Sequence, residues 1–364
     1  MVVSRGRQLA PDVSLTVLTR APRVDASRNI FAGETMVSRR TFALSLGALA
    51  LAAPFASLSQ SAKIPRIGYL QPIAPQNGTS PFLEDFRQGL RDLGYVEGKN
   101  IQIETRWGEG RLDRMPALAA ELVRMNVDVI FAVSSPSVWA AKNATKTIPI
   151  VMPTSSDPVG DGLVASLARP GGNITGMSLM APELSAKRLQ LLKEVFPKQV
   201  RPAAVLWNPD YYGMAARFKE IQTQAPTVGM NVRSVEIRDT RELEQALEDL
   251  DRERPDALVL LVDPLTMSQR LRIVGFAAEK RLPAIYEVEQ FVDAGGLMSY
   301  GPNIDEQVRH AATYVDKILK GAKPGDLPIE QPAKFDLVIN LKTAKALGVV
   351  IPQSVIVQAD RVIQ

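Results

Sequence analysis

Short apolar runs alternate with longer amphipathic segments along the chain from Ile64 to the C-terminus. The runs have the length of strands, and the segments between them repeat apolar positions with the period of a helix. The arrangement is clearest at 127–178, where strand 129–133 is followed by helix 137–145 and strand 148–152. A strand, a helix and a second strand within about 25 residues form a βαβ unit, which indicates a parallel sheet.

The same order of elements occurs twice. The first half has strands at 67–70, 101–105, 129–133 and 148–152, separated by helices at 82–93, 113–125 and 137–145. The second half has strands at 203–206, 232–237, 257–262 and 284–286, separated by helices at 211–227, 240–253 and 265–280. This repeat predicts two similar α/β lobes, each with a doubly wound parallel sheet.

Four more elements follow the repeat: a strand at 297–300, a helix at 304–320, a strand at 335–340 and a helix at 341–347. Gly348 follows the last helix, at the position where glycine commonly ends one. We expect the two lobes to share these elements. The first lobe is assigned residues 63–178 plus about 298–325, and the second 179–297 plus about 326–364.

The basic charge of the chain belongs to its first 63 residues. These hold eight Lys or Arg and three acids, so the remainder has 35 basic and 36 acidic residues out of totals of 43 and 39. The nearly neutral body gives no reason to expect nucleic-acid binding.

Residues 36–62 have the organisation of a signal peptide. Ser38-Arg39-Arg40-Thr41-Phe42 precedes an apolar run at 43–53, and small residues follow at 56–62. The arginine pair resembles a twin-arginine signal, and the alternative is a Sec signal that contains two arginines. We expect cleavage near 59–62 and a periplasmic protein. Residues 1–35 resemble neither signal nor domain, and the hypothesis is that translation starts at Met36.

The composition argues against an enzymatic function. The chain has no Cys and one histidine, His310, which precedes two alanines in a predicted helix. Histidine-based triads therefore have a single possible base, and the usual zinc sites cannot be formed. No glycine-rich phosphate motif follows a strand. Asp157 and Asp161 lie among Gly and Pro and are interpreted as turn residues. No catalytic residue, metal or cofactor is predicted.

A residue that can cap a helix is followed by proline at five places near predicted strand ends: Ser80-Pro81, Ser135-Pro136, Asp157-Pro158, Asn208-Pro209 and Asp263-Pro264. Each pair can start a helix whose free N–H groups point to the edge of its sheet. Ligands of open parallel sheets bind at that edge. A helix N-terminus there can hold a carboxylate without arginine, and Asp or Glu can hold an ammonium group.

Position at the strand ends selects the ligand-binding candidates Gln71, Ser134, Ser135, Thr154 and Asp157 in the first lobe, and Asn208, Asp263, Tyr286 and Glu287 in the second. Tyr286 is equally consistent with stacking on a flat ligand and with burial at a strand end. Tyr211 and Tyr212 begin a predicted helix close to these strand ends, within reach of a ligand bound in a cleft between the two lobes. Trp139 is assigned to packing.

Two segments carry a family resemblance: NATKTIPIVMPTSSDPVGDGLVASLARPGGNITG at 143–176 and FDLVINLKTAKALG at 335–348. They resemble the substrate-binding proteins of ABC transporters, in the branch often described as tryptophan/tyrosine-type, across roughly residues 64–362. The resemblance implies a type I periplasmic-binding-protein fold, with a hinge crossed three times and a ligand cleft between the lobes. It also implies a monomer that delivers its ligand to a membrane permease and its ATPase.

The favoured function is therefore exported binding of a small polar ligand. An amino acid is the first choice, and the family resemblance suggests an aromatic one. A small carboxylate or aromatic acid is the second choice. Two alternatives use the same scaffold. An enzyme such as a sugar-nucleotide transferase would need a base and a phosphate loop, and a repressor-type sensor would need a DNA-binding headpiece.

Overall fold

The computed structural model describes residues 63–75, 78, 80–179, 184–196 and 202–364. The predicted signal peptide and the extension before it lie outside these described residues. Within the described part, no helix is long and apolar enough to cross a membrane.

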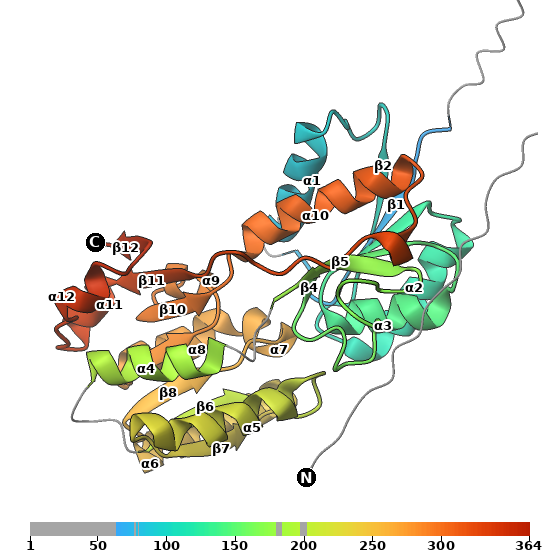
Figure 1. Cartoon of the computed structure of the whole chain (residues 1–364). Coiled ribbons are helices and arrows are strands. Elements are labelled where there is room, and N and C mark those ends of the chain that lie inside the picture. Colours follow the sequence, from blue (N-terminus) through green and yellow to red (C-terminus); the bar gives the residue numbers. More distant parts are fainter. Residues whose placement is uncertain (1–62, 76–77, 79, 180–183, 197–201) are drawn as a thin grey trace, which may run out of the picture. The chain divides into compact units, whose positions relative to one another are not determined.

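The first lobe is built on a five-stranded sheet in the order β2-β1-β3-β4-β5 (Figure 1). All of its strand pairs are parallel. The strands are β1 (Arg66–Gln71), β2 (Gln102–Trp107), β3 (Val129–Ala132), β4 (Ile150–Ser155) and β5 (Ile174–Ser178). The helices of this lobe are α1 (Pro81–Asp92), α2 (Met115–Arg124), α3 (Ser135–Ala144) and α10 (Ile304–Leu319). Helix α10 packs against α1 and against β3, β4 and β5, although it lies far along the chain.

The second lobe is built on a seven-stranded sheet in the order β12-β11-β10-β9-β8-β6-β7. Its pairs are parallel except that between β10 and β11. The strands are β6 (Ala203–Trp207), β7 (Val232–Glu236), β8 (Ala257–Leu260), β9 (Ala284–Tyr286), β10 (Met298–Gly301), β11 (Asp336–Asn340) and β12 (Arg361–Ile363). The helices are α4 (Ser185–Val195), α5 (Met214–Gln224), α6 (Thr240–Glu253), α7 (Pro264–Ser268), α8 (Arg270–Glu279), α9 (Gln290–Asp293), α11 (Leu341–Ala346) and α12 (Gln353–Ile356).

The structure confirms the two doubly wound parallel-sheet lobes that the repeat in the sequence predicts. The chain crosses between them after β5, between β10 and α10, and again before β11. Two crossing segments are joined by backbone hydrogen bonds, since Ser178 donates to the Glu330 carbonyl at 2.9 Å and Glu330 donates to the Gly176 carbonyl at 3.1 Å. The lobes are therefore joined by a hinge in which neighbouring chain segments pair with each other.

Four details differ from the sequence analysis. Strand β10 belongs to the second sheet, because it pairs with β9 and β11, so the predicted boundary at 298 places it in the wrong lobe. Strand β5 and helix α4 had no predicted counterpart. The helix predicted at 265–280 is two helices, α7 and α8, which meet at Gln269.

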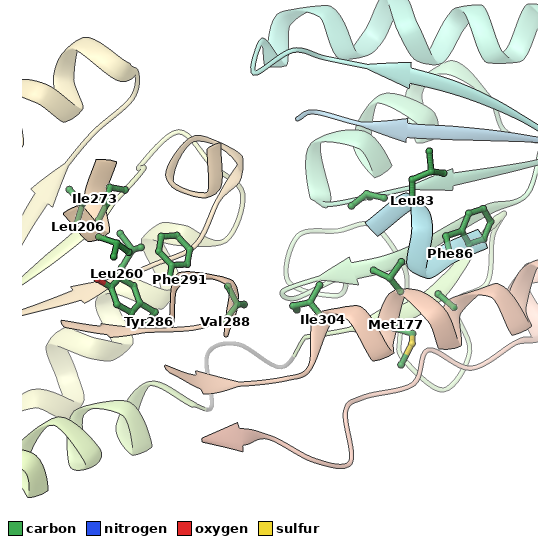
Figure 2. Close-up of a cluster of buried hydrophobic side chains, with 14 of the residues drawn as sticks. Leu83, Phe86, Met177, Leu206, Leu260, Ile273, Tyr286, Val288, Phe291 and Ile304 are labelled. Carbon is green, nitrogen blue, oxygen red and sulfur yellow. The ribbon is translucent and has the colours of Figure 1, made fainter. Parts of the chain in front are cut away.

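Buried apolar side chains cover the faces of both sheets. Figure 2 shows part of this core in two groups, one in each lobe. The labelled members from the first lobe are Leu83, Phe86, Met177 and Ile304, and those from the second are Leu206, Leu260, Ile273, Tyr286, Val288 and Phe291. This packing holds the carboxyl ends of the strands, where polar residues begin, in fixed positions.

Candidate ligand-binding site

A cavity lies at the carboxyl ends of the strands and takes its walls from both lobes. It has about 760 Å³ of empty space, its open mouth included. Gln71 ends β1, Ser134 follows β3 and Thr154 lies in β4, whereas Asp263 follows β8 and Glu287 follows β9. Most of the remaining wall is apolar and includes Pro72, Ile73, Phe82, Leu179, Met267, Val288 and Ile304. A few convergent polar groups in an apolar cavity are typical of a small-molecule site.

One side of the cavity is a buried ion network around Glu287. Its carboxylate accepts a hydrogen bond from Arg188 Nη1 at 2.8 Å and one from the Val262 N–H at 2.7 Å, and it also pairs with Arg217. All three charged side chains are at most 5 % exposed. Burial by itself would raise the pKa of Glu287, but Arg217 and Arg188 hold that pKa below its usual value. Burial lowers the pKa of Arg188 to about 10, so Arg188 still carries its charge at neutral pH.

Asp263 brings a second buried carboxylate to the cavity. It caps α7, because its Oδ1 accepts from the Thr266 N–H at 2.7 Å and the Thr266 hydroxyl accepts from the Asp263 N–H at 2.9 Å. Its Oδ2 accepts from Asn208 Nδ2 at 2.7 Å. Burial raises the pKa of Asp263. A cationic group of a ligand would favour the ionised carboxylate at this position.

The first lobe presents the N-terminus of α3 to the cavity. The N-cap residue, Ser134, has φ of 74°, which is unusual for a residue other than glycine. Its N–H donates to the Thr154 hydroxyl at 3.2 Å, which fixes the turn between β3 and α3. Gln71 is oriented similarly, because Tyr69 donates to its Oε1 at 2.6 Å. These contacts hold the polar side chains of this wall in place.

The structure brings five of the nine candidates together at the cavity: Gln71, Ser134, Thr154, Asp263 and Glu287. Asn208 lies behind Asp263 and supports it. Ser135 donates to Asp161 Oδ2 at 3.5 Å, and Asp157 lines a neighbouring cavity. Tyr286 is fully buried and stacks on Phe291, with ring centroids 4.9 Å apart, so its position fits the buried-aromatic alternative (Figure 2).

Sequence reasoning missed the two arginines, Arg188 and Arg217, and expected a carboxylate site without arginine. A signal for them exists in the helical periodicity. Arg188 is four residues after Leu184 and four before Leu192, and both leucines are buried. Arg217 lies three residues after Met214 and four before Ile221, which are also buried. An arginine within the apolar stripe of an amphipathic helix indicates a buried charge, which requires a partner.

Asp161, near the cavity, gives a prediction about pH. Burial, together with the charge of Asp157, raises the pKa of Asp161 to about 6. The folded protein thus favours the protonated carboxyl, and this contribution to stability is complete below about pH 4 and is lost as the pH rises through about 6. We expect Asp161→Asn, which mimics the protonated group, to raise the melting temperature at pH 7.5 and to bring a smaller gain at pH 5, within the range over which the contribution is lost.

Thermal unfolding at the two pH values measures this difference. Asp92→Asn, at an exposed position, is the control and should melt like the unaltered protein at both. An equal gain for Asp161→Asn at pH 5 and pH 7.5 would contradict the assigned titration.

The fold and the cavity define a two-lobed binding protein of the type I periplasmic class. Residues 75–363 match the family described as ABC transporter substrate binding protein, and the chain belongs to that family. It is 32% identical over 263 residues to the tyrosine-binding protein of Clostridioides difficile, a match that covers 72% of this chain and 75% of that protein. The family and this relative are solute-binding proteins, so the function is binding and not catalysis.

Solved structures agree with this assignment. A conserved domain protein from Vibrio cholerae is 29% identical, with a TM-score of 0.76 over 82% of this chain and all of that one. An ABC domain from Streptococcus pneumoniae in complex with L-Trp is 26% identical, with a TM-score of 0.76 over 82% and 99% of the two chains. The ligand-free, open structure of a substrate binding protein from Clostridium difficile is 28% identical but has a TM-score of 0.59, over 83% and 100%.

Proposed function

We propose that the protein is an exported binding protein that captures a free amino acid with an apolar or aromatic side chain and delivers it to an ABC permease. One observation carries the proposal. The cavity combines two buried cations, Arg188 and Arg217, and two buried carboxylates, Asp263 and Glu287, with largely apolar walls. The formal charges of the four groups cancel, so the site suits a ligand that carries both charges and no net charge.

Each part of such a ligand has a counterpart in the cavity. Arg217 Nε has no hydrogen-bond partner among the described residues, which leaves a buried donor for the ligand carboxylate. The N-terminus of α3 adds a second favourable position for that group. Asp263 can accept from the ammonium group, because each of its oxygens has a further lone pair. Phe82, Leu179 and Met267 offer apolar contact for the side chain.

Two relatives support an aromatic amino acid, since one is in complex with L-Trp and another is named for tyrosine. This chain superposes better on the tryptophan complex, with a TM-score of 0.76, than on the ligand-free open structure, with a TM-score of 0.59. The difference supports a closed arrangement of the two lobes in this protein. The proposed export to the periplasm rests on the predicted signal peptide at 36–62, and the monomeric state rests on the resemblance to the family. The permease and its ATPase are the partners that membership of the family implies.

A thermal-shift series tests the proposal. L-tryptophan, L-tyrosine and L-phenylalanine should each raise the melting temperature, because a ligand at 100 times its dissociation constant adds about 2.7 kcal/mol of stability. Tryptamine, which lacks the carboxylate, and indole-3-propionate, which lacks the ammonium group, should have much smaller effects. A sugar serves as the negative control. A response to indole-3-propionate equal to that to L-tryptophan would replace the amino acid with an aromatic acid.

A further inference from the structure

An aromatic contact joins the two lobes outside the ligand cavity. Trp139 lies in α3 of the first lobe, and Tyr212 lies in the second lobe between β6 and α5. Their ring centroids are 5.6 Å apart and their planes differ by 21°, which is a stacked arrangement. Lys142 Nζ lies 4.8 Å from the centroid of the Trp139 ring. Neither aromatic residue lines the cavity.

The residue before Tyr212 connects this contact to the cavity. Tyr211 lines the cavity and is 8 % exposed, and its hydroxyl lies beside the backbone of Ser135 at the start of α3. Consecutive residues of the second lobe therefore contact α3 of the first lobe, one at the cavity and one away from it.

The loop that carries the two tyrosines has a fixed shape. Asn208 Oδ1 accepts from the Asp210 N–H at 3.0 Å, and the Tyr211 carbonyl accepts from the Met214 N–H at 3.2 Å. Gly213 has φ of 72°, and a Cβ at this position would lie 3.3 Å from Asp161 Oδ1 of the first lobe. A larger residue would be strained and would crowd the opposite lobe. The loop is therefore shaped for close approach of the two lobes.

We propose that Tyr212 and Trp139 form an interlobe clasp that holds the closed state and sets how long the ligand stays bound. The clasp rests on the proposed function, because a lifetime of binding presupposes a ligand in the cavity. Separation of the lobes must break the stack, although neither residue lines the ligand cavity. The stack consequently favours the closed state over the open one, and it slows the opening through which a ligand leaves.

Dissociation of radiolabelled L-tyrosine from the purified protein tests the clasp. A stacked pair of this kind changes an equilibrium by about 2- to 12-fold, so Tyr212→Ala should speed dissociation about three- to tenfold with little change in the association rate. Tyr212→Phe keeps the ring and should dissociate like the unaltered protein. Trp139→Leu should have an effect of similar size, and the double variant should be no faster than either single variant.

A second measurement does not depend on the ligand. Since the chain has no cysteine, Arg124→Cys in the first lobe and Lys219→Cys in the second can carry a pair of spin labels at exposed positions. In the ligand-free protein, Tyr212→Ala should shift the label-to-label distances toward longer, more open values, and Tyr212→Phe should not. Unchanged distances together with dissociation rates within twofold of the unaltered protein would overturn the clasp. If L-tyrosine does not bind at all, the proposed ligand class fails, and the distances alone decide the clasp.

Discussion

Replacement of Glu287 by alanine is expected to lower the free energy of unfolding by about 3–5 kcal/mol. The carboxylate pairs with Arg188 and Arg217 where all three side chains are almost completely buried. Alanine would leave two guanidinium groups in the interior without their counter-ion, and it would also leave the Val262 N–H without its acceptor. The main effect is therefore the cost of the charges left behind.

Urea unfolding followed by circular dichroism measures this loss. Glu244→Ala is the matched control, because Glu244 pairs with Arg272 at 2.7 Å on the surface, where both side chains are more than 40 % exposed. Its removal should cost less than about 1 kcal/mol. Equal losses for the two variants would show that burial contributes nothing to the importance of Glu287.

Asp263→Asn is expected to weaken the binding of L-tryptophan or L-tyrosine by about 30-fold or more, because loss of one partner of a buried charge pair costs at least about 2 kcal/mol. Asparagine is itself a good N-cap residue, so the start of α7 should survive and only the negative charge is lost. The local contact that would be weakened is the hydrogen bond from the Asn208 side chain, because its amide group would then face the amide of the new asparagine.

Isothermal titration calorimetry measures the affinity. Asp239→Asn is the control, since Asp239 caps α6 through the Glu242 N–H at 2.7 Å without lining the cavity. This variant should bind like the unaltered protein. Undiminished affinity in Asp263→Asn, with its melting temperature also unchanged, would remove Asp263 as the partner of the ligand ammonium group.

Much of the fold could be predicted because hydrophobic periodicity reports it directly. The exceptions have physical reasons. Strand β5 contains Thr175, Gly176 and Ser178, so it is buried without being an apolar run. Helix α4 buries Ser185 and Arg188 on the face where its leucines lie, which obscures its amphipathic pattern. The apolar run of strand β10 could be predicted, but the sheet to which it belongs depends on its pairing with β9 and β11. Helix α9 separates it from β9 in the sequence, and β11 is more than 30 residues away.

The candidate site was predictable only in part. Topology places the ends of β1, β3, β8 and β9 at the cavity, and that rule found Gln71, Ser134, Asp263 and Glu287. It says nothing about side chains that enter from helices. Arg188 and Arg217 come from α4 and α5, and their common partner, Glu287, is about 99 and 70 residues away. A buried ion network of this kind is a property of the tertiary structure.

The late position of α10 in the chain has a consequence for biogenesis. This helix covers α1 and three strands of the first sheet, yet it consists of residues 304–319 of 364. During synthesis the strands of the first lobe are made early. Their apolar face stays exposed until α10, which covers it in the folded protein, has been translated. The lobe that begins first thus cannot be completed first, and both lobes reach their final packing only near the end of translation or after it. Until then, nascent chains expose a surface that chaperones or the export machinery can bind.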